Sequence, residues 1–403
     1  MEGDSSLIPM EVFWEILMWL PVKSLMRFKC VCKLWLSVIL NPSFARAYRG
    51  GFKGLLLTNI RYLSQYSDVD VDFFYLNLLE GEGMLTNMFH QYTLHRGGKK
   101  RFTGVVNGLV CYYCGKYSWI YNIATRESMQ LPDSTHDSIA WFYHLGFDPS
   151  KQTYKLIKTC YDRRELEKFQ KDGRDVFPSR IKSEIFTIGV DSSWRSIDHA
   201  PWVVYNTGLC IDGVLYWTDP EICSRGQLLC FDLAREEFRF VFHPQESLVH
   251  RLRLLWFGPN VALSASKILP DSNQATVLYL HNDGTASQDG GMQDSWKEHI
   301  VYLPQVLKPG EPEQYALYTP MGILPGGEVI FMNRIKINWE FPAVLYLYDP
   351  TKREVKKRYM WSCPSSIAQQ HKVDISDYVY LWHYEENIMP LNCLGSQSRS
   401  TSE

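Results

Sequence analysis

The residue types that most often carry out chemistry are thinly spread in this chain. Cys111 and Cys114 have the spacing of two zinc ligands, but a structural zinc site needs four ligands and the sequence offers no second pair at suitable spacing. Both cysteines also lie in an apolar run typical of a β-strand, where positions three apart point to opposite faces. We therefore interpret them as strand residues, and we expect no metal site and no cofactor.

Familiar catalytic patterns are missing as well. The eleven histidines form no His-Glu-x-x-His cluster, and the sequence has no Gly-x-Ser-x-Gly elbow and no Walker loop. Catalytic groups can assemble from distant positions, so a missing motif does not exclude an enzyme. It does leave an enzymatic hypothesis without a residue to rest on, and we expect a protein that is not an enzyme.

The stretch 7–44 predicts three short helices rich in large apolar side chains. Pro9 suits the first turn of a helix, and apolar residues then recur at helical spacing until Pro21 begins a second helix. The third helix ends before Asn41-Pro42, because the residue before a proline is pushed out of the α region. About 40 residues cannot build an adequate core alone, although burying one large apolar side chain is worth roughly 1.5–3 kcal/mol. Some of this surface must pack on the following domain, as a helical cap would, or on another protein.

In order and spacing, these residues resemble the F-box family. The matching elements are Ile8-Pro9, Glu15-Ile16-Leu17, residues 20–25, residues 30–33 with Trp35, and Asn41-Pro42 with Phe44. The resemblance implies that the helices bind a Skp-type adaptor and, through it, the cullin and RING subunits of an SCF-type ubiquitin ligase. The residues that we expect at the adaptor are Ile8, Pro9, Val12, Ile16, Leu17, Leu20, Pro21, Val22, Leu25, Cys30, Val31, Lys33 and Trp35.

Composition is that of a folded protein with a sizeable core. Of 403 residues, 45% are hydrophobic and 14% aromatic, and the formal net charge is −2. This charge gives no reason to expect a nucleic-acid or membrane partner. No apolar run reaches the roughly 20 residues that span a bilayer, and the first residues lack the features of a secretory signal. We expect a protein of the cytoplasm, the nucleus or both, with its ten cysteines reduced.

After Phe44 the sequence changes to short β-rich runs separated by turn residues. Residues 54–58 and 72–76 predict early strands, and the acidic residues 67–72 between them are interpreted as a surface turn. A strand pair around a Gly turn then recurs, followed by an aromatic residue, an Asp or Asn, and a tight turn. This unit occupies residues 107–127, 209–238 and 321–355. The Asp or Asn side chain can hold the turn by bonding the backbone two residues on.

A second kind of unit lies between these repeats, with Ser-Trp-basic triplets starting at 193 and 295. The alternating units are about 50 residues long, the blade length of a kelch-type propeller, and predict about six blades, with five or seven left open. The runs at 108–111, 146–155, 193–197 and 213–217 resemble the F-box-associated, kelch-like domain of plant F-box proteins. The expected fold class is thus α+β in separate domains: a three-helix F-box (1–50), an all-β propeller-like domain (51–388) and a disordered tail (389–403).

The expected function is substrate recognition for an SCF-type ligase, in which the β domain holds an unknown target protein and promotes its ubiquitination. Two alternatives stay open: an F-box scaffold acting outside a ligase, and a kelch-like enzyme or carbohydrate-binding module with a helical cap. Because Trp and Arg are favoured interface anchors, Trp141, Arg163 and Arg164 are candidates for target contact. Other tryptophans, among them Trp217 and Trp256, are expected mainly in the core, with a few lining the loop face of the propeller.

Overall fold

The chain is described here by a computed structural model. It describes residues 9–51, 53–62, 68–76, 85–87, 89–97, 101–114, 116–133, 141–161, 181–197, 204, 207–218, 227–242, 252–257, 260–265, 274–281, 295–302, 319–334, 343–361 and 378–394. The chain divides into two compact units. Unit 1 comprises residues 1–54, 101–203 and 384–403, and unit 2 comprises residues 55–100 and 204–383.

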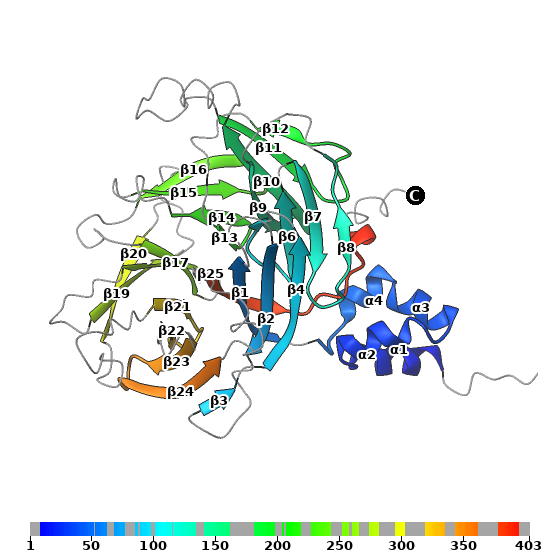
Figure 1. The fold of residues 1–403 in the computed structure, drawn as a ribbon, viewed down its shortest axis with the longest axis horizontal. Coiled ribbons are helices and arrows are strands. Elements are labelled where there is room, and N and C mark those ends of the chain that lie inside the picture. Colours follow the sequence, from blue (N-terminus) through cyan, green and yellow to red (C-terminus); the bar gives the residue numbers. More distant parts are fainter. Residues whose placement is uncertain are drawn as a thin grey trace, which may run out of the picture. The chain divides into compact units, whose positions relative to one another are not determined.

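Unit 1 begins with the expected short helices (Figure 1). These are α1 (Met10–Met18), α2 (Val22–Phe28), α3 (Lys33–Ile39) and α4 (Pro42–Ala47). Pro9 and Pro21 precede α1 and α2 as N-cap residues. Asn41-Pro42 ends α3, as expected, but it also starts a fourth helix. The side chain of Asn41 accepts a hydrogen bond from Ser43 N at 2.8 Å, and Pro42 occupies the first helical position.

The rest of unit 1 is built mainly from two four-stranded antiparallel sheets. The first has the order β5 (Arg101–Phe102), β6 (Leu109–Cys114), β7 (Tyr117–Asn122) and β8 (Ser128–Gln130). The second contains β9 (Trp141–Asp148), β10 (Thr153–Tyr161), β11 (Ile181–Thr187) and β12 (Arg195–Ile197), also paired in sequence order. A 3-10 turn, η2 (Leu391–Cys393), contacts β8. Leu391 and Leu394 are buried there, within the stretch assigned from sequence to the tail; residues 395–403 lie outside the described residues.

Unit 2 holds the remaining strands. One sheet has the order β25 (Tyr378–Glu385), β1 (Lys53–Tyr62), β2 (Asp68–Leu76) and β4 (Phe89–Gly97). A second sheet contains β13 (Leu209–Ile211), β14 (Val214–Trp217), β15 (Gln227–Asp232) and β16 (Glu237–Phe242). The third contains β17 (Leu252–Phe257), β18 (Asn260–Ala265), β19 (Gln274–His281) and β20 (Ser295–Tyr302), then β21 (Thr319–Ile323), β22 (Val329–Arg334), β23 (Ala343–Asp349), β24 (Glu354–Trp361) and β3 (Leu85–Asn87).

The nine-stranded sheet contains two four-stranded antiparallel meanders, β17–β20 and β21–β24. A single parallel pair, Phe257 with Ile323, joins them. Counted this way, the five sheets of the described residues contain six four-stranded groups. The expectation of helices followed by an all-β, propeller-like domain of about six blades is confirmed. In one group β25, from the end of the domain, pairs with β1 from its beginning.

The interpretation of residues 67–72 as a turn is wrong for the described part of that stretch. Residues 68–72 belong to β2, which pairs with β1 on one side and β4 on the other. Asp68, Asp70 and Asp72 alternate with Val69 and Val71. This period of two is the strand signal, and it outweighs the turn preference of aspartate.

The expected turn chemistry is confirmed in the three repeats and recurs in a fourth turn, at Asp148. Asn122, Asp148, Asp232 and Asp349 each accept hydrogen bonds through Oδ1 from the backbone N–H groups two and three residues on, at 2.9–3.3 Å. The residue four places after each has a positive φ: Arg126 (62°), Gln152 (54°), Glu236 (60°) and Arg353 (56°). Non-glycine residues rarely adopt this conformation. The hydrogen bonds from the Asp or Asn side chain stabilise it, and the same five-residue turn therefore recurs in several sheets.

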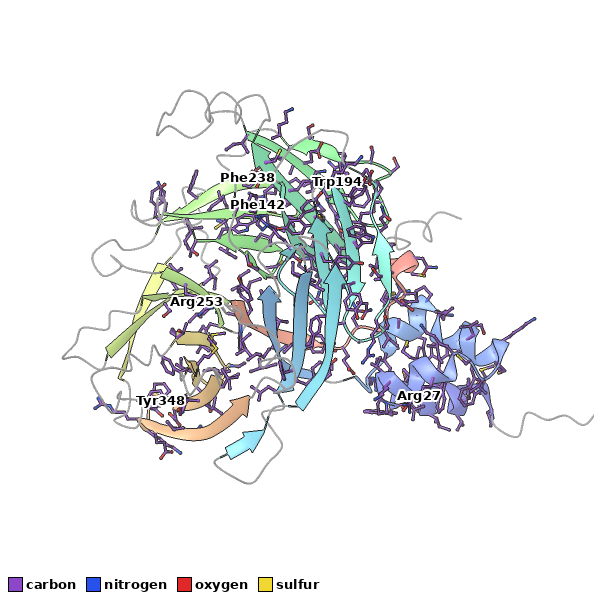
Figure 2. The ribbon with its side chains drawn as sticks, viewed as in Figure 1. Arg27, Phe142, Trp194, Phe238, Arg253 and Tyr348 are labelled. Carbon is purple, nitrogen blue, oxygen red and sulfur yellow. The ribbon has the colours of Figure 1, made fainter. Side chains whose placement is uncertain are left out.

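The sheet β9–β12 encloses a buried ion pair. Lys158 Nζ lies 2.5 Å from Glu184 Oε2, and their side chains are 0% and 2% exposed. The ammonium group also lies 3.7 Å from the ring centroid of Trp194, which Figure 2 labels beside this sheet. Burial lowers the pKa of Lys158 to about 8, although Glu184 opposes the shift. Each charge is therefore tolerated only because the other is present.

Glu184→Gln should destabilise the folded chain by about 3 kcal/mol, because it leaves the Lys158 ammonium buried without its counter-charge. The double variant Lys158→Met/Glu184→Leu should recover most of that loss, since it removes both charges. Urea unfolding at neutral pH measures both values. Asp133→Asn is the matched control, because its pair with Lys116 is solvent-exposed and should change stability by less than about 1 kcal/mol. Equal losses in Glu184→Gln and Asp133→Asn would contradict this account.

Candidate functional site

The four helices share a core that is closed on one side by the end of the chain. Its fully buried members are Leu17, Met18, Val22, Leu25, Val38, Ile39, Phe44 and, from the C-terminal segment, Ile388. Trp35 packs at the edge of this core, with its ring centroid 5.1 Å from that of Phe13 and 4.8 Å from that of Phe28. These contacts fix the angles between α1, α2 and α3.

The same helices leave a second set of large apolar side chains in water. We call this set the helical apolar surface; its exposed fractions lie between 37% and 58%, and its members are Met10, Val12, Ile16, Trp19, Val31, Leu34, Leu36 and Leu40. Val12, Ile16 and Trp19 follow one another at helical spacing along α1. A stripe of exposed apolar side chains such as Val12, Ile16 and Trp19 marks an interaction site, whereas single exposed ones need no explanation.

The helices around this surface are basic. Residues 9–50 contain Lys23, Arg27, Lys29, Lys33, Arg46 and Arg49 but only two acidic residues, Glu11 and Glu15. Lys29 is committed to an ion pair with Glu127, 2.9 Å away, while Lys23, Arg27 and Lys33 are exposed. The whole chain, by contrast, has a formal net charge of −2. A partner with an acidic surface would meet a local excess of positive charge here.

Comparison with known proteins identifies the region. The F-box domain family matches residues 5–46, and the family described as the F-box associated beta propeller domain matches residues 69–382, more than half of the chain. The chain belongs to the F-box proteins that carry this propeller domain. The helices α1–α4 are thus its F-box.

Relatives from Arabidopsis thaliana agree with this assignment. F-box protein At4g11590 is 30% identical over 65% of this chain and 67% of its own length. F-box protein At5g62660 is 30% identical over 73% of this chain and 79% of its own length. For At3g52320 the identity is 30% and the match spans 62% of this chain and 64%, less than two thirds, of that relative.

Solved structures give only a remote match. The WD40 domain of SCAP from fission yeast is 8% identical with a TM-score of 0.31, and the match covers 74% of both chains. Kluyvelomyces marxianus Hsv2 is 8% identical with a TM-score of 0.29 over 72% of this chain and 94% of that one. At such scores the similarity carries no argument about function.

The residues expected at the adaptor fall into three groups. Those exposed on the F-box are Pro9, Val12, Ile16, Pro21, Cys30, Val31 and Lys33, and those partly buried are Leu20 and Trp35. Leu17, Val22 and Leu25 lie in the core with at most 3% of their surface exposed, so in the free chain they support the surface from beneath. Ile8 lies outside the described residues. Direct contact with an adaptor stays a prediction for the whole set.

Sequence reasoning left out five members of the helical apolar surface. They are Met10, Trp19, Leu34, Leu36 and Leu40. A signal was present, because α1 reads Met-Glu-Val-Phe-Trp-Glu-Ile-Leu-Met and is apolar on more than one side. A helix that is apolar almost all round must be covered on more than one face, and its own core covers only the Leu17 side.

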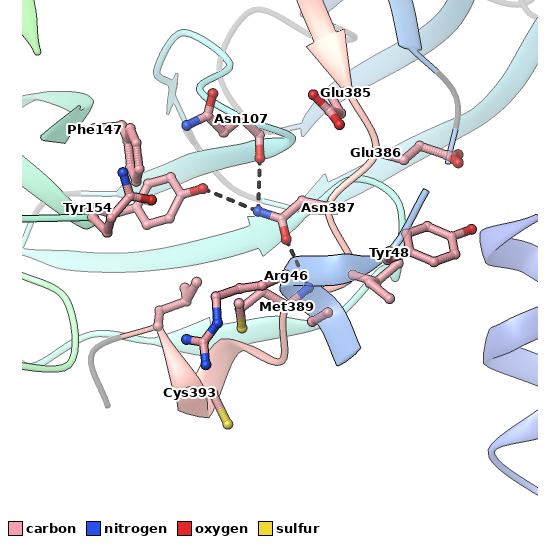
Figure 3. A pocket seen from close by; sticks show the side chains of 14 residues that line it. Arg46, Tyr48, Asn107, Phe147, Tyr154, Glu385, Glu386, Asn387, Met389 and Cys393 are labelled. Atoms are coloured by element: carbon pink, nitrogen blue, oxygen red, sulfur yellow. Dashed lines mark hydrogen bonds between the residues drawn. The ribbon is translucent and has the colours of Figure 1, made fainter. Parts of the chain in front are cut away.

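The C-terminal segment attaches the F-box to the sheets of unit 1. The Asn387 side chain donates to the Asn107 carbonyl at 3.0 Å and to Tyr154 Oη at 3.2 Å, and it accepts from Met389 N at 2.8 Å (Figure 3). The Asn387 carbonyl in turn accepts a bond from Asn122 Nδ2 at 2.8 Å. The next residue, Ile388, enters the F-box core. Two adjacent residues thus bind β-sheet loops and helices at once.

Two further contacts hold the start of the F-box linker. Tyr48 donates its hydroxyl to the Leu20 carbonyl, and burial raises the pKa of that phenol. A Cβ at Gly50 would meet backbone atoms of Trp19 and Leu20 at 2.6 Å, so only glycine fits without displacing the chain. A cavity of about 380 Å³ remains beside α4, lined by Arg46, Tyr154, Asn387 and other residues of unit 1 (Figure 3).

Residues expected at the target are not placed by the structure. Trp141 begins β9, but only its backbone is described, and Arg163 and Arg164 lie outside the described residues.

The basic stretch 352–358 runs from the β23–β24 turn into β24. Within it, Lys356 Nζ pairs with Glu328 at 2.7 Å and with Asp349 at 3.1 Å. The hydrogen bond from Lys356 lowers the pKa of Glu328, whereas the pKa of Asp349 is lowered chiefly by the Thr351 hydroxyl, with Lys356 adding to the effect.

The cysteine pair lies in β6, with Cys111 buried and Cys114 partly exposed. Burial raises the pKa of the Cys111 thiol, which opposes the thiolate form that metal binding needs. Among the residues that the structure describes, no group of three His, Cys, Asp or Glu side chains could hold a metal ion. Within the same residues, no helix has both the length and the apolar character needed to cross a membrane.

Asn387→Ala should lower the free energy of unfolding by about 1–3 kcal/mol, because it leaves the Asn107 carbonyl and the Met389 amide without their side-chain partner. Hydrogen exchange should rise first at the amides of α4 and of residues 386–394 if the segment holds the F-box in place. Asn392→Ala, at an exposed position two residues before the end of the described chain, is the control. Unchanged protection of α4 in Asn387→Ala would contradict the attachment role.

Proposed function

We propose that the chain is the substrate-recognition subunit of an SCF-type ubiquitin ligase. Its F-box binds a Skp-type adaptor, the adaptor connects it to the cullin and RING subunits, and the propeller domain binds a target protein. The chain itself makes and breaks no bonds. Its contribution is proximity. It holds a target lysine close to the charged ubiquitin carrier, and without it the two would meet rarely.

The helical apolar surface supports this proposal best. The helices already have a filled core, so these eight side chains are surplus to the stability of the free chain. Because each side chain is already about half buried, covering the rest is worth roughly 1 kcal/mol per residue, and the sum contributes to a specific interface against the costs of association. Among the described residues of unit 1, the F-box contacts the rest of the unit through the Lys29–Glu127 pair and through the side of its core that Ile388 and Ala124 cover, whereas these eight side chains stay exposed.

The contacts between the F-box and the sheets of unit 1 support separate roles for the two domains. In unit 1 the F-box is tied through Ile388 and Asn387 to Asn107, in the turn before β6, and to Tyr154 on β10. A tie of this kind would transmit the position of the adaptor to the propeller domain, so that a bound target is presented at a fixed place. We propose the boundaries 1–50 for the F-box and 51–388 for the propeller, with residues 386–394 acting as the tie; residues 389–394, expected from sequence in the disordered tail 389–403, are thus ordered against unit 1.

Ile16→Asp should abolish binding to a plant Skp-type adaptor while the chain stays folded, because Ile16 is 49% exposed and has no core to lose. Leu17→Ala, one residue away and 1% exposed, should instead cost about 2–5 kcal/mol of stability and weaken binding through loss of the helix. Pull-down and calorimetry of the full chain measure binding, and thermal unfolding measures stability. Wild-type affinity in folded Ile16→Asp would overturn the proposal.

The basic F-box should make the association salt-dependent. Raising ionic strength should slow association and leave dissociation nearly unchanged, because charges at the rim steer encounter more than they hold the complex. Lys33→Gln, at an exposed position, should reduce the salt slope of the association rate. Arg235→Gln, at an exposed turn position of unit 2, is the control. Stopped-flow kinetics at several salt concentrations provide the measurement, and a slope that Lys33→Gln leaves unchanged would count against the electrostatic part.

The scaffold alternative makes a different prediction for the assembled complex. An F-box protein working outside a ligase would bind the adaptor without recruiting the cullin. Reconstitution of the chain with adaptor, cullin and RING subunits, followed by gel filtration, distinguishes the two. Co-elution of all four supports the ligase role, and a stable pair that excludes the cullin supports the scaffold.

A further inference from the structure

Unit 2 contains a cavity of about 280 Å³ at the first strands of its meanders. Its walls come from the start of β13, from β17 and β21, and from β25, together with Thr207 and Thr218 beside β13 and β14. Two tryptophans, Trp256 and Trp382, and Tyr380 line it with aromatic surface. It lies in a different unit from the F-box, and the proposed adaptor binding leaves it unused.

The aromatic walls are held rigidly. A Cβ added to Gly322 would meet atoms of the Trp256 indole at 2.6–2.8 Å, so glycine allows the ring to lie directly on the backbone. Trp382 donates its Nε1–H to Thr58 Oγ1 at 2.9 Å, and its ring stacks on Tyr380 with centroids 5.6 Å apart. A site whose walls cannot rearrange loses little entropy when a flat ligand enters.

The indole N–H groups of Trp256 and Trp382 differ in whether they have a hydrogen-bond acceptor. Trp382 uses its donor within the protein, whereas Trp256, only 5% exposed, has no acceptor for its Nε1–H among the described residues. A buried donor without an acceptor costs about 1–3 kcal/mol, and most buried polar groups in native proteins are paired. An acceptor atom on a ligand would remove this cost.

The charge of the cavity selects the kind of acceptor. Of its eleven lining residues only Arg253, on β17, is charged, and none is acidic. A guanidinium group recognises carboxylates through parallel N–H donors, and the hydroxyls of Thr207, Thr218 and Tyr380 add further polar groups. Leu254, Met321 and Leu381 add apolar side chains to this lining. Polar groups placed beside apolar and aromatic side chains can fix the orientation of a small ligand.

We propose that this cavity binds an aromatic carboxylate, with its ring between the Trp256 and Trp382 walls and its carboxylate at Arg253 and the Trp256 Nε1–H. A cavity of about 150 Å³ already accommodates benzene, so 280 Å³ has room for a bicyclic acid. The ligand comes either as a free small molecule or as the C-terminal residue of a peptide chain. The proposal goes beyond adaptor binding and stands whether or not the F-box engages an adaptor.

Calorimetric titration of the full chain with 2-naphthoate tests the proposal, beside 2-naphthamide, which keeps the shape and loses the charge. Naphthoate should bind at least roughly tenfold more tightly than the amide. Arg253→Gln should abolish that preference, and Trp256→Phe should weaken naphthoate binding by roughly five- to tenfold, since it removes one hydrogen bond and keeps an aromatic ring. Arg235→Gln, an exposed arginine of the same unit, should bind like the wild type.

Thermal unfolding of each variant controls for folding, and Arg253→Lys replaces Arg253→Gln if the latter does not fold; it should lose part of the preference because it keeps the charge without the planar fork. A peptide ending in Gly-Phe, as free acid and as amide, identifies the source. Tighter binding of the free-acid peptide than of naphthoate points to a chain terminus, and the reverse points to a free small molecule. Equal affinity for acid and amide, variants that match the wild type, or no saturable binding at millimolar naphthoate would each overturn the proposal.

Discussion

Four helices of six to nine residues cannot bury every large apolar side chain that they carry, and the rest of this molecule's behaviour depends on that limit. The F-box resolves it in two directions. One set of side chains, centred on Leu17 and Leu25, fills a core that Ile388 completes. The other set, including Val12, Ile16 and Val31, remains in water. A larger domain would cover both sets itself, because the buried fraction of the surface rises with size.

The need for Ile388 makes the F-box more than an appended module. Ile388, from the C-terminal segment, completes its core. The neighbouring Asn387 forms hydrogen bonds with residues of two sheets. Helices and sheets of unit 1 therefore share stability. For the proposed function this matters, because a separate helical segment on a flexible linker would hold a target at no fixed place, and catalysis by proximity depends on that place.

Buried polar groups elsewhere are satisfied by their neighbours in most cases, which makes the exceptions informative. Lys158 is held by Glu184 and the face of Trp194, and Asp349 by its own turn and Lys356. Trp256 contrasts with them, because its donor faces no acceptor in the described residues although its ring is fixed by close packing on Gly322. Arg253 lines the same cavity as this ring, and the proposed ligand site rests on these two observations.

The sequence by itself determined the elements whose causes are local. Helix starts at Pro9 and Pro21 depend on a fixed φ, and the recurring turns depend on an Asp or Asn side chain reaching its own backbone, so both could be predicted from adjacent residues. For residues 68–72 the acidic composition predicts a turn, but the alternation of Asp and Val predicts the strand that the structure contains.

Only the tertiary structure decided which apolar residues of the F-box face the core and which face water. Leu17 and Ile16 are neighbours of similar hydrophobicity, yet one is 1% and the other 49% exposed, because helix packing and the arrival of Ile388 select one face. The role of Asn387 and the meeting of Trp256, Arg253 and Trp382 around one cavity are equally beyond the sequence. They join positions more than 120 residues apart, and no local period or propensity records which distant strands will lie side by side.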